Sequence, residues 1–179
     1  MLSIQISFSQ NSNHSELANI DKFVQDNINL ILEKIPSSQI TEFGFQSTEE
    51  YTIAKPAKAL YFLIYEDKRE INIWRVPITV NGEYRALLNI SENNGELKIA
   101  DFGANLLARE IQQTIISHQN LNFEGLLRSY QKGSDFMIAI NENGEKVYIP
   151  LNSAIKTFAE KGIELKPTYS DNDLKNLLK

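Results

Sequence analysis

The chain has 179 residues and a formal net charge of −5, and its Lys and Arg residues are scattered along the sequence. Because nucleic-acid binding needs clustered cations, this charge balance argues against a nucleic-acid partner. The absence of cysteine excludes disulfides, thiolate metal sites and cysteine nucleophiles. No apolar run approaches the roughly 18 residues that a membrane span requires.

The first nine residues allow two interpretations. They are mostly apolar, and Ser7-Phe8-Ser9 has the small-x-small spacing of a signal-peptidase site. The same stretch also alternates between apolar and polar residues, as a β-strand does. We expect residues 1–9 to be either a truncated signal peptide or a first strand, residues 10–165 to form one domain, and residues 166–179 to be a polar C-terminal tail.

Helical spacing is clear over residues 15–35, where apolar side chains recur every three or four positions until Pro36. This pattern predicts an amphipathic helix that packs on a sheet. Residues 40–45 are compatible with a short strand. The continuous apolar run over residues 60–65 predicts a strand that is covered on both faces.

Residues 71–102 predict a three-stranded antiparallel meander with turns at Asn81-Gly82 and Asn94-Gly95. A two-residue Asn81-Gly82 turn would pair the apolar residues of the first strand with the polar residues of the second. We therefore expect a three-residue loop that places Ile78 opposite Tyr84, since burial disfavours a register that flips one strand. The same reasoning predicts a four-residue second loop, over residues 92–95.

The second half predicts helices and one further hairpin. The hairpin turns near Gly144, with Ile138 opposite Val147, and it resembles the hairpin at Gly95, 49 positions earlier, in being followed by a helix. An internal duplication and two ordinary Asn-Gly hairpins both remain open. The expected helices cover residues 104–118, 123–131, 152–161 and, weakly, 171–178.

This order of elements predicts the α+β class: a single domain with an antiparallel β-meander sheet and helices packed on one face. The second face of the meander is the candidate binding surface, because two arginines on a flat strand face can hold carboxylates bidentately. A solvated strand face is the alternative. In this interpretation Arg85 is exposed, and Arg85→Ala leaves folding intact. The candidate binding residues are Arg75, Thr79, Arg85 and Asn89.

No catalytic or cofactor-binding motif accompanies these residues. Neither His14 nor His118 has a second ligand at metal-binding spacing, and the serines lack a Gly-x-Ser-x-Gly context. There is no glycine-rich phosphate loop. We therefore expect no catalytic residue, no metal and no cofactor.

One stretch resembles a known group of proteins. Lys55-Pro56, the run LYFLIY, Trp74-Arg75-Val76-Pro77 and the two Asn-Gly turns resemble small exported bacterial modules of the PepSY-like and cystatin-like type. The resemblance covers roughly residues 50–108 and departs at Lys55, where those modules have a small residue or glycine nearby. It implies an extracytoplasmic, non-catalytic module that binds or restrains a partner protein.

We therefore expect a non-enzymatic, exported module that binds a protein or peptide, with an exposed meander edge able to accept an added strand. The first alternative is a small-ligand carrier, with a pocket between the sheet and the N-terminal helix lined by Phe23, Trp74 and Tyr84. The second is an enzyme of unrecognised class, which a buried carboxylate beside His118 would support.

Overall fold

The computed structural model describes residues 13–66 and 72–179, except for the side chains of residues 13–16. Both interpretations of residues 1–9 fall outside this range. The helices are α1 (Asn13–Leu32), α2 (Asn105–Ser117), α3 (Asn152–Ala159) and α4 (Asp171–Leu178), with 3-10 turns η1 (Ser37–Gln39) and η2 (Thr48–Ile53). The strands are β1 (Lys55–Pro56), β2 (Leu60–Ile64), β3 (Asn72–Val80), β4 (Glu83–Asn93), β5 (Glu96–Gly103), β6 (Asn122–Ser129), β7 (Ser134–Ile140) and β8 (Lys146–Pro150).

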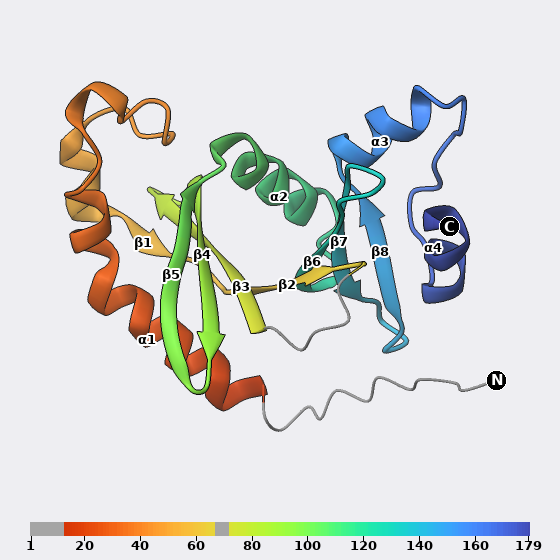
Figure 1. Cartoon of the computed structure of the whole chain (residues 1–179), viewed down its shortest axis with the longest axis horizontal. Helices are drawn as coiled ribbons and strands as arrows, with labels where there is room; N and C mark the ends of the chain where they lie inside the picture. The colour runs from red at the N-terminus through yellow and green to blue at the C-terminus, as the bar shows by residue number, and fades with distance from the viewer. Residues whose placement is uncertain (1–12, 67–71) are drawn as a thin grey trace.

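In the described part of the chain the strands form one sheet in the order β5-β4-β3-β2-β6-β7-β8, and the short β1 pairs with β3 beside β2. Every pairing is antiparallel except the one between β2 and β6. The predicted α+β class and antiparallel sheet are confirmed. Figure 1 shows α1 at one end of the sheet, α3 and α4 at the other, and α2 between them.

The helices lie over both faces of the sheet rather than one, because both faces are apolar. Alternate residues of β7 show this: Phe136 and Ile138 pack with α3 and α4, whereas Met137 and Ala139 pack with α2. On β3 and β4 the α1 face is equally apolar. Its buried residues there are Trp74, Val76, Ile78, Val80, Ala86, Leu88 and Ile90.

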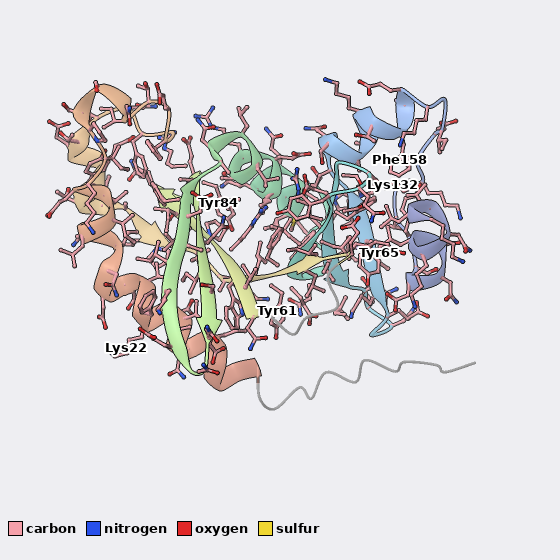
Figure 2. The ribbon with its side chains drawn as sticks, viewed as in Figure 1. Lys22, Tyr61, Tyr65, Tyr84, Lys132 and Phe158 are labelled. Carbon is pink, nitrogen blue, oxygen red and sulfur yellow. The ribbon has the colours of Figure 1, made fainter. Side chains whose placement is uncertain are left out.

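The strand predicted over residues 60–65 is confirmed as β2, and it is covered on both faces. Leu60 and Phe62 join the core under α2, whereas Leu63 packs with α3 and α4. Tyr61, labelled in Figure 2, packs against the α1 core. One five-residue strand thus contributes to all three apolar clusters.

The predicted registers of the meander are wrong, although its three strands are confirmed. Asn81-Gly82 is a two-residue turn with both residues at positive φ, and Val80 pairs directly with Glu83. A bulge restores the apolar match one step later, because the pairing moves from Thr79–Tyr84 to Ile78–Ala86 and leaves Arg85 without a partner on β3. The Asn94-Gly95 turn also has two residues, and a bulge at Ala100 follows it.

The helix predicted over residues 123–131 is wrong, because this segment is the strand β6. It pairs in parallel with β2 and is buried on both faces, so its apolar residues do not alternate with polar ones. Gly125 permits the close approach: a Cβ there would lie 2.9 Å from the carbonyl oxygen of Tyr61. Periodicity alone could not separate such a strand from a helix.

Smaller corrections concern the connections. Residues 40–45 form turns, not a strand. The last hairpin has a five-residue loop, which places Ile138 opposite Tyr148 instead of Val147. The helices expected over residues 15–35, 104–118, 152–161 and 171–178 are present, and Leu174 and Leu178 of α4 are buried against the domain.

The two hairpin–helix segments do not form a structural repeat. After the β4–β5 hairpin, α2 packs on the face that contains Leu87 and Met137. After the β7–β8 hairpin, α3 packs on the opposite face, against Phe136. The shared pattern is that of two hairpins of similar sequence with differently placed helices.

We predict that Gly125→Ala lowers the free energy of unfolding by about 1–3 kcal/mol, as overpacking of a filled core does. The added Cβ would press on the backbone of β2 and weaken the pairing that joins the two halves of the sheet. Urea denaturation of the purified protein measures the change.

The matched control is Gly95→Asn, where a Cβ meets nothing within 4 Å and asparagine tolerates the positive φ. We expect it to cost only the backbone strain of a side chain at positive φ, about 1 kcal/mol or less, with no added clash. Equal effects of the two substitutions would contradict the close approach of β2 and β6.

Candidate binding site

The structure brings together two of the four predicted binding residues. Arg75 and Asn89 are direct partners on β3 and β4. The guanidinium of Arg75 lies 3.7 Å from the centre of the Phe62 ring, and burial lowers the pKa of Arg75. Thr79 instead donates a hydrogen bond to the carbonyl of Lys55, which ties β3 to β1.

Arg85 is buried, which corrects its assignment to an exposed face. It is the extra residue of the bulge, and its side chain turns toward the segment that contains η2. The residue is only 7% exposed. Its Nη2 lies 3.2 Å from a carboxylate oxygen of Glu50, and its Nη1 lies 3.0 Å from one of Glu83.

The two carboxylates that face Arg85 differ in their surroundings. The side chain of Glu50 is 14% exposed and also accepts a hydrogen bond from the backbone N–H of Gln46. The side chain of Glu83 is 67% exposed. Glu50 is therefore the partner of Arg85 that a second hydrogen bond fixes in place. Glu83 contacts Arg85 from the solvent and remains largely exposed. The Nε of Arg85 is buried and has no hydrogen-bond partner among the described residues.

A cleft of about 420 Å³ opens beside Arg85, between the start of β4 and α2. Tyr84, labelled in Figure 2, lies at this end of β4 beneath α2, and burial raises its pKa. The lining residues are Gln46, Glu83, Tyr84, Arg85, Arg109, Gln112 and Gln113.

On the side away from β3, the sheet leaves this part of β4 without a neighbouring strand, because β5 ends at Gly103, opposite Leu87. The side chain of Gln112 fills part of that place. It accepts a hydrogen bond from the N–H of Tyr84 and donates one to the carbonyl of Gly82. A side-chain amide on α2 thus satisfies backbone groups that a strand would otherwise pair.

The pocket predicted between the sheet and the N-terminal helix does not assemble from its named residues. Phe23 and Trp74 pack together in the α1 core, where Trp74 is fully buried. Tyr84 lies on the opposite face, in the core under α2, because the bulge at Arg85 reverses the side on which it points.

A second hollow, of about 190 Å³, is lined by Glu110 of α2 and by His118, the residue that follows α2. Burial raises the pKa of Glu110, but its carboxylate accepts a hydrogen bond from the N–H of Asn152 at the start of α3. The two residues are eight positions apart, which is about 12 Å along a helix. The Nδ1 of His118 lies 2.9 Å from the carbonyl oxygen of Thr114, so Glu110 and His118 each contact a backbone group and form no hydrogen bond with each other.

The two edges of the sheet differ. On β8, the N–H and carbonyl of Tyr148 exchange hydrogen bonds of 2.9 Å with Tyr169, and α4 follows directly. On β5, no strand pairs with the outer side in the described part of the chain. Ile99, 39% exposed, is the largest exposed apolar residue of that edge.

Comparison with known proteins adds no relative: no family model, no curated protein and no solved structure matches this chain. None of the described helices is long and apolar enough to cross a membrane. Among the described residues, no group of three or more His, Asp or Glu side chains could hold a metal ion.

We predict that Arg85→Ala lowers the free energy of unfolding by about 2–3 kcal/mol, because it leaves the poorly exposed Glu50 carboxylate without its cation. Thermal and urea denaturation measure the loss. Lys22→Ala, which removes one partner of the solvent-exposed Lys22–Asp26 pair, serves as the control and should leave the melting temperature and the urea midpoint nearly unchanged. Wild-type stability of Arg85→Ala would mean that the guanidinium is solvated after all.

Proposed function

We propose that this protein is a non-enzymatic module that binds an extended segment of another protein by adding it as a strand to β5. The observation that carries the proposal is the asymmetry of the sheet, in which β8 is paired at its central residue Tyr148 by Tyr169 and the β5 edge is unpaired within the described residues. Backbone groups on such an edge can pair with an incoming chain.

The geometry of β5 limits where that pairing occurs. Asn93 and Glu96 flank a two-residue turn and so form its closing hydrogen-bonded pair. Alternation then directs the backbone N–H groups of Leu97 and Ile99 away from β4. Beyond Ile99 the bulge at Ala100 bends the strand, so the regular segment open to a partner is residues 96–99.

The side chains of β5 favour a specific partner over non-specific edge pairing. Glu96 and Lys98 form an exposed ion pair of 3.2 Å, and such charges discourage association between bare edges. Ile99 follows this ion pair and precedes the bulge at Ala100, and its exposed side chain offers an apolar contact. A partner segment with complementary charges around one apolar residue fits this strand.

The second candidate function is a small-ligand carrier. The cleft beside Arg85 favours it, because this cleft is the larger of the two hollows described above. Its polar lining suits a polar ligand, in contrast to the apolar pocket expected next to α1.

We predict that Ile99→Pro abolishes binding of a peptide added to β5. The probe is a random dodecapeptide library displayed on phage, from which the tightest binder is synthesised. Proline removes the outward N–H of residue 99 but leaves intact the ladder that faces β4, so affinity should fall at least tenfold with little change in melting temperature. Ile99→Ala, which keeps the N–H, is the matched control and should lose less.

Hydrogen exchange of the wild-type complex locates the peptide independently. Slower exchange at residues 97 and 99 is the expected result. A peptide that protects β8 or the cleft instead, or that binds Ile99→Pro as well as wild type, would refute strand addition at β5.

We also propose that the protein acts outside the cytoplasm, which rests on the resemblance over residues 50–108 and on Ser7-Phe8-Ser9. Intact mass measured in each cell fraction of the source organism is the test. A mature chain that begins at Gln10 in the periplasmic or secreted fraction is the expected outcome. A chain that retains residues 1–9 in the cytosol would remove the support for export.

A further inference from the structure

We infer that the cleft beside Arg85 is a site for a carboxylate with an adjacent amide, the chemistry shared by a peptide C-terminus and an N-acylated amino acid. The site does not depend on strand addition, because it lies on the flank of β4 beyond the end of β5.

Arg85 is the first element of this site. It is more than nine-tenths buried, yet it lines the cleft and keeps one N–H group, at Nε, without a partner among the described residues. A buried unpaired donor costs free energy unless something accepts from it. A carboxylate that enters the cleft could accept from this guanidinium, and the planar fork of arginine suits a carboxylate.

The charges of the cleft match a monoanion once Glu83 moves away. The Glu83 carboxylate contacts Nη1 of Arg85 from the solvent side and makes no other hydrogen bond or ion pair among the described residues, so a ligand carboxylate can take its place. Arg85 and Arg109 then contribute two positive charges and Glu50 one negative charge, which leaves one net positive charge. Arg109 is exposed and has no ion pair among the described side chains, so it is available to the ligand.

The glutamine side chains supply the second half of the recognition. The side-chain amide of Gln112 already forms hydrogen bonds with the backbone of Gly82 and Tyr84. It shows that an amide group fits beside β4 at this point. Gln46 and Gln113 are exposed on the cleft wall, and their side-chain amides make no hydrogen bond to another described residue. Each can both donate to and accept from an amide next to the bound carboxylate.

Titration of the ¹⁵N-labelled full-length protein with N-acetylalanine tests the site, and N-acetylalaninamide is the neutral isostere. We expect N-acetylalanine to shift the amide signals of Tyr84, Arg85 and Gln112, and the neutral compound to shift them at least fivefold less at equal concentration. Similar shifts from both compounds would overturn the proposal, since they would show that the charge is not recognised.

Substitution of exposed residues should raise or lower the affinity for N-acetylalanine in a direction that the proposal fixes. Glu83→Gln removes the internal competitor and should tighten N-acetylalanine at least threefold, whereas Arg109→Gln should weaken it at least threefold. Lys22→Gln removes an exposed cation on α1 that does not line the cleft, and is the control that should leave N-acetylalanine binding unchanged. Unchanged or weaker binding by Glu83→Gln would overturn the exchange of carboxylates.

A longer ligand distinguishes a peptide C-terminus from a single N-acylated amino acid. N-acetyl-trialanine with a free C-terminus should bind more tightly than N-acetylalanine if the site takes a peptide end. Weaker binding of the tripeptide would identify a single acylated amino acid. Both results support the shared chemistry, and failure of both compounds to shift the cleft signals would refute it.

Discussion

The fold depends on the central position of β2. This strand pairs antiparallel with β3 and parallel with β6, so it is the only strand of the described part that joins the first half of the chain to the second within the sheet. Its side chains reach all three cores: Phe62 lies under α2, Leu63 under α3 and α4, and Tyr61 beside the α1 core. Since burial of apolar area is the main stabilising contribution, loss of this strand would expose every cluster at once.

The two Asn-Gly turns impose a second constraint. Two-residue turns with both residues at positive φ match the right-handed twist of the strands that they connect, and this preference prevails over the apolar match of the residues next to the turn. The mismatch is then corrected by one extra residue on each hairpin, Arg85 on β4 and Ala100 on β5. The first bulge buries an arginine and reverses Tyr84, and the cleft lies at this position.

Local patterns predicted the elements that local physics determines. The amphipathic spacing of α1 and α2 and the apolar run of β2 were sufficient to identify them. The strand β6 was not identifiable, because its neighbour β2 lies about 60 residues earlier in the chain. Both of its faces are buried, so its sequence lacks the alternation of apolar and polar residues that indicates a strand. Of the site, the sequence indicated arginines on the meander. It could not indicate that a bulge would bury Arg85 against Glu50, since that contact joins segments 35 residues apart.

On β4 and β8, backbone groups that have no neighbouring strand form hydrogen bonds with other residues of the described chain. Gln112 of α2 pairs with β4 where β5 stops, and Tyr169 pairs with β8 where the sheet stops. Backbone groups left unpaired are costly when they are buried, so each of these substitutes also allows the neighbouring helix to pack close to the sheet. On the outer side of β5 no such substitute is present among the described residues. Pairing from another chain at β5 would therefore not require the described residues to give up a strand pairing of their own, and main-chain hydrogen bonds to such an edge are the source of affinity in strand addition.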